Sequence, residues 1–136
     1  MVKATNANEQ LVLDFFATLS TGELEKIRAT LHPDATWTPQ VKDVPGAGVH
    51  RGRDTIVDEF LAPVRGLFKQ GDPKTHVDTI FSKGNTVMCE THGVGTLADG
   101  RQYNNLYAWA VEIKDGKVFA IREYMDSHYV MKLFAN

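Results

Sequence analysis

The 136-residue sequence has a single cysteine, Cys89, so a disulfide within the chain is excluded. It has no long apolar run, and its first ten residues, MVKATNANEQ, lack the apolar region of a secretion signal. The formal net charge is −2, which leaves no excess of basic residues for binding a polyanion. We therefore expect a cytoplasmic protein with neither a nucleic-acid partner nor a membrane partner, in which Cys89 is a core residue rather than a nucleophile.

No internal repeat and no low-complexity segment interrupts the chain. A hydrophobic fraction of 43% is ordinary for a globular protein and sufficient to build a core. The length suits one domain and leaves little room for two. We predict a single domain over residues 1–136.

Two helices are predicted near the start. Asn6 followed by Glu9 resembles a capping box, and apolar residues then recur at helical spacing up to Leu19. Ser20 and Glu23 suggest a second capping box, which would open a helix ending before Pro33.

A short strand is predicted over 34–38, around Trp37, followed by a loop rich in proline and glycine, PQVKDVPGAGVHRG. A third helix should begin at Asp54, and Pro63 should kink or break it.

The second half changes from helical to alternating periodicity. Four strands are predicted, and short connections such as Asp115-Gly116 indicate antiparallel hairpins between them. Helices first and strands later predict an α+β fold in which the helices cover one face of an antiparallel sheet. The strand ranges are 75–83, 86–97, 101–114 and 117–126.

The strand over 103–113 carries apolar or aromatic residues on both faces, with Trp109 on one face and Leu106 on the other. Helices covering one face account for only half of this pattern. We therefore expect the other face to meet a second subunit in a homodimer formed through the sheet.

Three segments carry a resemblance to a known family: FFATLSTGELEKIRATLHPDATW, HRGRDTIVDEF and ADGRQYNNLYAWAVEIKDGKVFAIREYMD. In this order and spacing the chain resembles the SnoaL-like family of the nuclear-transport-factor-2-like, or ketosteroid-isomerase-like, superfamily. The resemblance covers nearly the whole chain. It implies a cone-shaped curved sheet wrapped around N-terminal helices, with an apolar pocket and a dimer. Because this fold hosts many activities, each activity has to be tested against particular residues.

Two known catalytic sets of the superfamily are missing. Where a steroid isomerase would carry its acid, tyrosine and protonated acid, this sequence has Pro39, Phe15 and Ala108. Where a limonene epoxide hydrolase would carry an arginine and an aspartate, it has Thr91 and Gly93. We therefore expect neither activity.

The stretch REYM around Glu123 is similar to the phenazine-biosynthesis A/B family, in which a glutamate at this place is an acid/base residue in the cavity. Alternation places Glu123 on one strand face with Phe119, Ile121 and Met125, where an apolar pocket would raise the pKa of its carboxyl group. Two other interpretations remain: a buried ion pair with Arg101 or Arg53, or a β-bulge that turns the side chain outward.

His50, where the loop returns to the third helix, is the second candidate for proton transfer. Glu90 and His92 share a strand face, but they are too few ligands for a metal ion, so we expect no metal site. We expect both side chains to lie on the convex face of the sheet. Thr91 would then face inward and leave space for a ligand. The residues that we predict to bind substrate are Trp37, Thr91, Asn105, Tyr107, Phe15 and Phe119.

These observations favour a cofactor-independent acid/base enzyme of the isomerase, cyclase, dehydratase or condensation type, acting on a small apolar carbonyl compound. A non-catalytic binder of such a molecule and a dimerisation module of the same fold are the alternatives. Asn105 and Tyr107 share a face with Trp109, so the dimer interface is a second possible role for both.

Overall fold

A computed structural model describes residues 2–135. The first helix, α1 (Ala7–Thr21), begins as the capping box predicts: the Asn6 side chain accepts a hydrogen bond from the Glu9 N–H at 2.9 Å. The second capping box was a wrong prediction. Because α1 continues to Thr21, Ser20 lies inside it and donates to the Phe16 carbonyl, and α2 (Leu24–Thr30) begins without a side-chain cap.

The helix predicted from Asp54 is present, and it changes from α-helix to π-helix and back to α-helix along its length. It consists of α3 (Arg53–Thr55), the π-helical turn η1 (Ile56–Leu61) and α4 (Ala62–Arg65). At the junction the Ala62 N–H bonds to the carbonyl of Val57, five residues back. Pro63, which has no N–H to donate, therefore lies in the first turn of α4. The π-helical turn η1 precedes it, so the chain stays helical where we expected a kink or a break.

The four predicted strands form an antiparallel meander with boundaries close to those expected: β3 (Lys74–Lys83), β4 (Thr86–Thr96), β5 (Gln102–Lys114) and β6 (Lys117–Met125). The remaining two strands are β1 (Leu31–Pro39) and the short β2 (His50–Arg51).

The whole sheet is mixed rather than purely antiparallel, with the order β2-β1-β6-β5-β4-β3. β1 lies parallel to β6. It enters the sheet from α2 and not through a hairpin with β6, so the connection does not impose an antiparallel direction.

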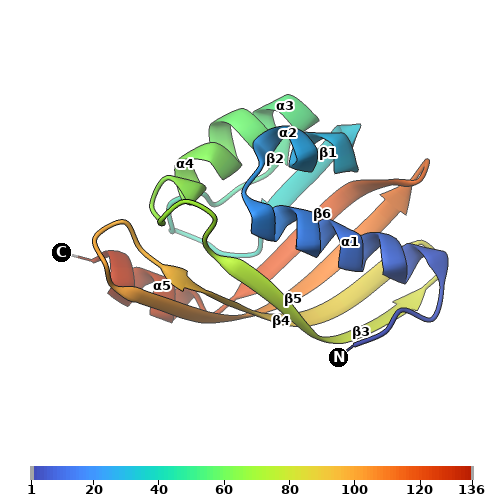
Figure 1. The fold of residues 1–136 in the computed structure, drawn as a ribbon. Helices are drawn as coiled ribbons and strands as arrows, with labels where there is room; N and C mark the ends of the chain where they lie inside the picture. The colour runs from blue at the N-terminus through green and yellow to red at the C-terminus, as the bar shows by residue number, and fades with distance from the viewer. Residues whose placement is uncertain (1, 136) are drawn as a thin grey trace.

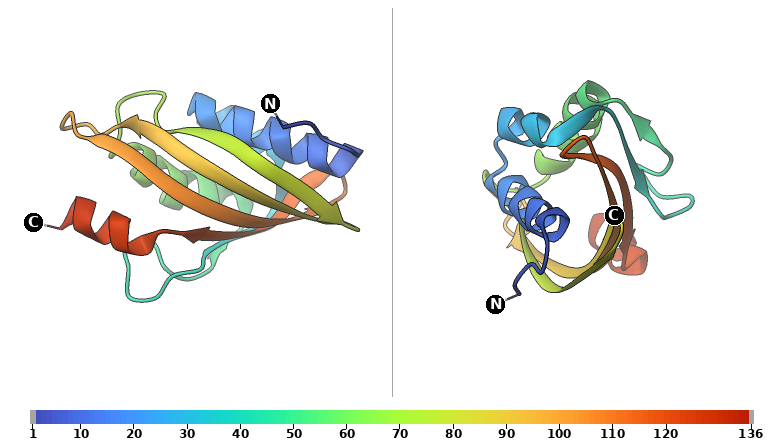
Figure 2. Two further views of the ribbon diagram at one scale, coloured as in Figure 1. Left: turned by 90° about the horizontal axis from the view of Figure 1, so that it is seen from below. Right: turned by 90° about the vertical axis from the view of Figure 1, so that its right-hand side faces the viewer.

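The sheet curves around α1, as the right-hand view of Figure 2 shows, and the other helices lie along its rim (Figure 1). Phe16 of α1 packs edge-on against Trp109 of β5, with ring centroids 5.1 Å apart, at the centre of the core. The α+β cone expected from the sequence is therefore confirmed.

A C-terminal helix, α5 (Ser127–Phe134), follows β6 and was not predicted. Asp126 caps it by accepting a hydrogen bond from the Tyr129 N–H at 3.1 Å. Within residues 2–135, no helix has the length and apolar character needed to cross a membrane.

Candidate functional site

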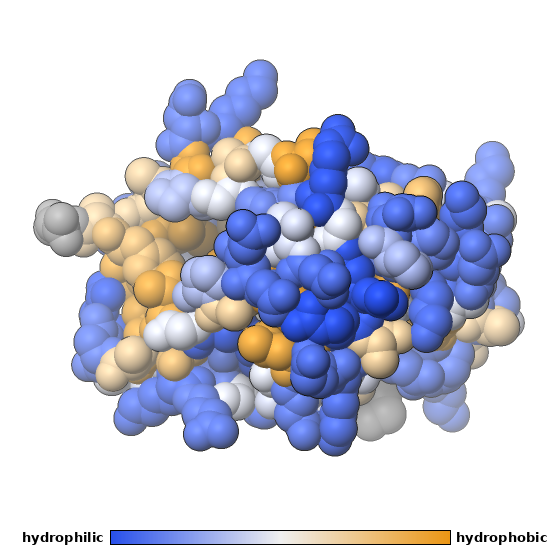
Figure 3. All heavy atoms as spheres, turned by 90° about the horizontal axis from the view of Figure 1, so that it is seen from above, coloured by the Kyte–Doolittle hydropathy of each residue, from blue (hydrophilic) through white to orange (hydrophobic). Residues whose placement is uncertain are grey.

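A cavity of about 670 Å³ opens between the concave face of the sheet, the 53–65 helix, the loop after β1 and α5. Its size lies in the range of small-molecule sites. Apolar side chains gather at this end of the molecule, on the left of Figure 3. The cavity wall is formed mainly by apolar and aromatic residues, including Trp37, Phe60, Phe68, Tyr103, Tyr107, Trp109, Met125, Val130 and Met131.

Glu123 brings a carboxyl group to this wall. It lies on β6 opposite Trp109 of β5, and its residue is 9% exposed. The described residues give its Oε1 one side-chain partner, the indole N–H of Trp37 on β1, at 2.8 Å. Both side chains point to the concave face, so they meet diagonally across neighbouring strands.

Burial raises the pKa of the Glu123 carboxyl to about 7, and the hydrogen bond from Trp37 opposes part of that rise. The ion-pair interpretation was wrong, because Arg101 pairs with Asp99, and no salt bridge to Glu123 occurs in residues 2–135. A carboxyl group that titrates near neutral pH can accept and return a proton at little cost, which is what acid/base chemistry requires.

The bulge occurs elsewhere on the same strand and corrects another prediction. Between β5 and β6 the pairing passes from Glu112–Ala120 to Ile113–Val118, which leaves Phe119 unpaired. The extra residue turns Phe119 away from the cavity, and its ring packs edge-on against His32 at 5.1 Å. Phe119 therefore does not line the cavity, and the alternation that we expected begins only at Ile121.

His50 does line the cavity, at its mouth. It pairs with Trp37 in the sheet, and its ring stacks on Phe60 with centroids 4.1 Å apart. Its Nε2 lies 2.8 Å from the Gly46 carbonyl oxygen, which can only accept, so Nε2 carries a hydrogen.

Tyr107 also lines the cavity, together with Tyr103, which was not among the predicted site residues. Their hydroxyl groups are hydrogen-bonded to each other. The alternation of Tyr103, Asn105, Tyr107 and Trp109 along β5 is the signal that would have identified Tyr103. The face that carries them is the concave one, so Tyr107 does not face outward as an interface residue would.

Thr91 and Asn105 face inward but lie one layer behind the cavity wall. Thr91 accepts a hydrogen bond from the Trp109 indole N–H at 2.8 Å, and Asn105 donates to the Tyr103 hydroxyl at 3.1 Å. Neither is among the residues that form the wall. Each therefore orients an aromatic residue of the wall, because a buried hydroxyl or amide has to use its hydrogen-bonding capacity locally.

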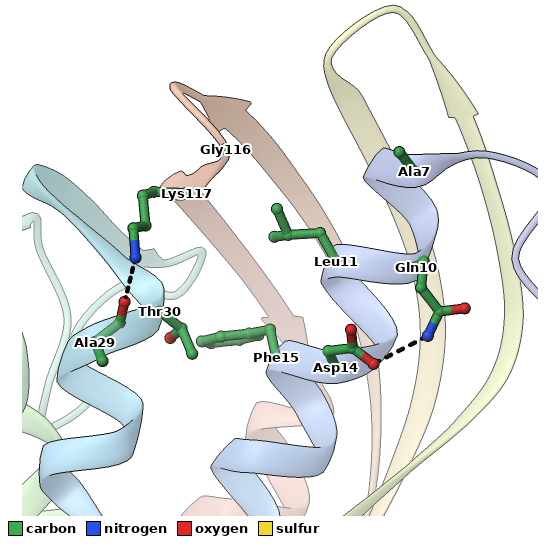
Figure 4. A pocket seen from close by; sticks show the side chains of 9 residues that line it. All are labelled: Ala7, Gln10, Leu11, Asp14, Phe15, Ala29, Thr30, Gly116 and Lys117. Atoms are coloured by element: carbon green, nitrogen blue, oxygen red, sulfur yellow. Dashed lines mark hydrogen bonds between the residues drawn. The ribbon is translucent and has the colours of Figure 1, made fainter.

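Phe15 does not reach the cavity either. It is buried beside Trp37, at a centroid distance of 6.1 Å, and borders a separate groove of about 440 Å³. Figure 4 shows its ring extending from α1 towards Thr30. In this groove Lys117 donates to the Ala29 carbonyl and Gln10 to Asp14, so these polar side chains are already engaged (Figure 4).

Glu90 and His92 lie on the convex face, as expected, where they bond to Thr79 and Asp78. In the part of the chain that the structure describes, no cluster of three or more His, Cys, Asp or Glu residues could hold a metal ion. Cys89 is buried in the core, where burial raises the pKa of its thiol to about 12 and so disfavours the thiolate.

Solved structures share this architecture over nearly their whole length. TerC, co-crystallised with polyporic acid, is 20% identical with a TM-score of 0.82, covering 96% of this chain and 100% of its own. A nuclear-transport-factor-2-like protein of unknown function from Burkholderia pseudomallei is 17% identical with a TM-score of 0.81, covering 97% and 100%. A candidate SnoaL-like polyketide cyclase from Jannaschia sp. CCS1 is 16% identical with a TM-score of 0.77, covering 97% and 95%.

At these identities the likeness establishes the fold alone. A search of curated proteins gives no match. The SnoaL-like domain family, however, matches residues 12–121, which include β1 with Trp37 and β6 up to Ile121. That span exceeds half of the chain, so this protein belongs to the SnoaL-like domain family.

Proposed function

We propose that this protein is a cofactor-independent acid/base enzyme that moves a proton next to the carbonyl group of a small apolar substrate. The observation that carries the proposal is the Glu123 carboxyl, which lies in the wall of an apolar cavity with the Trp37 N–H as its hydrogen-bond donor. Its raised pKa keeps both protonation states accessible near neutral pH.

In this scheme Glu123 removes a proton from the carbon beside the carbonyl group, which leaves an enolate. Returning the proton to another carbon gives isomerisation, and giving it to a hydroxyl group that the enolate expels gives dehydration with release of water. If the enolate carbon instead attacks a second carbonyl group, the proton goes to the oxygen of that group, which gives cyclisation or condensation. The apolar wall orients the substrate and excludes water from the carboxyl group. His50 at the mouth is the second group able to exchange a proton. One structural neighbour is named as a candidate polyketide cyclase and another as a candidate isomerase. Both names are compatible with an acid/base enzyme.

Deuterium exchange tests this proposal without knowledge of the natural substrate. With 2-tetralone, a small apolar ketone, in D₂O, the protein should accelerate incorporation of deuterium beside the carbonyl group, measured by proton NMR. Glu123→Gln should lower that rate about 100-fold or more, since a positioned base contributes roughly 10²–10⁴. Glu112→Gln, a carboxylate on the outer side of β5 that pairs with Arg122, is the matched control and should retain the rate.

A non-catalytic binder is the second candidate, favoured by how fully the cavity is lined with apolar groups. A binder would take up the ketone equally well before and after Glu123→Gln and would give no exchange above buffer with either protein. That result would replace the enzyme proposal.

We further propose a homodimer formed through the convex face of the sheet. Leu106 on β5 and Tyr124 on β6 are diagonal neighbours there, with 67% and 43% of their surface exposed, and Phe81 on β3 is 62% exposed. Large apolar side chains exposed together on one face are typical of interaction surfaces.

A further inference from the structure

Three side chains on β5 form a chain of hydrogen bonds that leads into the cavity. The Asn105 amide donates to the Tyr103 hydroxyl at 3.1 Å, and the Tyr103 and Tyr107 hydroxyls are bonded to each other. Tyr103 and Tyr107 both line the cavity, whereas Asn105 lies behind them and is 2% exposed.

The direction of this chain is fixed at its inner end. The Asn105 Oδ1 accepts from the Leu106 backbone N–H at 2.9 Å, and its Nδ2 donates to the Asp126 carbonyl at 3.4 Å. An N–H can only donate and a carbonyl can only accept, so the amide cannot be in the flipped orientation. Asn105 is therefore the donor to Tyr103.

One hydroxyl hydrogen of the tyrosine pair remains free for a ligand. The pair has two hydroxyl hydrogens, and the bond between the two groups uses one of them. Donation from Asn105 polarises the Tyr103 hydroxyl and makes it the better donor, which favours the order Asn105 to Tyr103 to Tyr107. The Tyr107 hydrogen is then the free one, and Tyr107 is one of the residues that line the cavity.

The position of Tyr107 relative to Glu123 suits one substrate held between them. Tyr107 pairs with Met125 and Glu123 with Trp109, so the two residues are diagonal neighbours on the concave face of β5 and β6. The Cα atoms of such neighbours are roughly 7–8 Å apart, and both side chains extend to the same face of the sheet. One substrate in the cavity can therefore present its carbonyl oxygen to Tyr107 and the adjacent carbon to Glu123.

We infer that Tyr107, oriented by Tyr103 and Asn105, is the oxyanion-binding donor of this site, and that the substrate is a ketone or related carbonyl compound that can enolise. This inference rests on the proposed function of Glu123. When Glu123 takes the proton, the electron pair of the broken C–H bond moves to the carbonyl oxygen, and the hydrogen bond from Tyr107 strengthens as that oxygen becomes negative. Tyr103 and Asn105 are positioning residues.

Burial keeps the donor in its protonated form. It raises the pKa of both tyrosine hydroxyls, and the Glu123 carboxylate raises them further by repulsion. At about pH 8.5 Glu123 is ionised and can only accept, whereas Tyr107 still donates. A ligand that can only accept therefore distinguishes the two groups at this pH.

The test uses benzophenone labelled with carbon-13 at its carbonyl, which accepts a hydrogen bond but has no proton beside the carbonyl to lose. Diphenylmethane, of nearly the same shape without the oxygen, is the matched ligand. At about pH 8.5 the wild-type protein should bind the ketone roughly three- to tenfold more tightly than the hydrocarbon, as one hydrogen bond allows. The bound carbonyl resonance should move downfield from its position in an apolar solvent.

Tyr107→Phe should bring the two affinities together and remove most of the downfield shift. Tyr103→Phe should retain a smaller shift, because the donor remains but is no longer polarised. Tyr124→Phe, on the convex face, is the control and should change neither measurement. The double variant Tyr103→Phe/Tyr107→Phe should remove the shift completely.

Equal binding of ketone and hydrocarbon by the wild-type protein, or a shift that Tyr107→Phe leaves intact, would overturn this inference while the base role of Glu123 stands. If neither ligand binds, both the apolar cavity site and this inference are wrong. Loss of deuterium exchange in Glu123→Gln with no difference in Tyr107→Phe would likewise contradict the oxyanion role alone.

Discussion

The Trp37 indole N–H and the Glu123 carboxylate, 2.8 Å apart, join β1 to β6 at the wall of the cavity. The two residues are 86 positions apart in the sequence and meet only because β1 lies parallel to β6. This hydrogen bond opposes part of the rise that burial causes in the pKa of Glu123, so it sets the acidity of the carboxyl group as well as stabilising the fold.

Removing the donor should raise the pKa of Glu123 further. In Trp37→Phe the ring is still apolar, but the N–H that favours the charged carboxylate is gone. Loss of a buried hydrogen bond and of part of a large side chain should also lower the free energy of unfolding by about 1–3 kcal/mol. A pH titration of labelled glutamate by NMR and denaturant unfolding measure the two effects. An unchanged pKa would mean that the bond does not act on the acid.

The pKa of Glu123 should make stability depend on pH. The folded protein holds this proton more tightly than the unfolded chain, with a pKa of about 7 against 4.5, so unfolding releases it between these values. Raising the pH through this window should lower the free energy of unfolding by on the order of 3 kcal/mol. The contribution is fully present below about pH 4.5 and is lost above about pH 7.

Glu123→Gln provides the comparison for this measurement, because Gln cannot titrate but still accepts from Trp37. The unfolding free energy of the wild type minus that of the variant should therefore fall as the pH rises from 4.5 to 7, because only the wild type loses stability from this group. Parallel curves for the two proteins would show that the carboxyl group titrates alike in both states.

His50→Phe tests the second proton-transfer candidate while retaining an aromatic ring to stack on Phe60. If His50 exchanges protons with the substrate, deuterium exchange into 2-tetralone should fall by roughly tenfold or more. If the ring only anchors the 46–50 turn through the Gly46 carbonyl, the rate should be retained, and limited proteolysis of that turn should become faster instead.

Leu106→Glu tests the proposed dimer. A charge at the most exposed apolar position of the convex face should favour the monomer, because it would have to be desolvated in the interface. Sedimentation equilibrium should give half the mass of the wild type. Val49→Glu, at a residue that is 47% exposed and outside the sheet, is the control and should remain dimeric. A monomeric wild-type protein would contradict the proposal directly.

Local signals in the sequence were sufficient for most of the fold. The Asn6–Glu9 cap, the glycine turns and the alternating strands predicted elements close to their observed boundaries. The parallel pairing of β1 was not predictable in the same way, because it depends on contacts between distant segments. The helix α5 had a signal, the Asp126 cap, that was interpreted only as the end of a strand.

The candidate site was partly predictable, because the alternation of residues along a strand is also a local signal. Alternation grouped Glu123 with Ile121 and Met125 and Tyr107 with Trp109, and in the structure Glu123 and Tyr107 both line the cavity. Alternation failed at Phe119, because this residue is unpaired and an extra residue in a strand shifts the preceding side chains to the opposite face of the sheet. It also could not separate residues of the wall from those one layer behind, such as Thr91, since both face inward.

The most direct test of the account is the pKa of Glu123 itself. Carbon-13 NMR of protein labelled at the glutamate carboxyl carbons, with Glu123→Gln assigning the resonance, follows its titration in the folded state. The account predicts a midpoint near pH 7. A midpoint near 4.5, the ordinary value for a glutamate, would mean that water reaches the carboxyl group freely, and the proposed proton transfer would lose its basis.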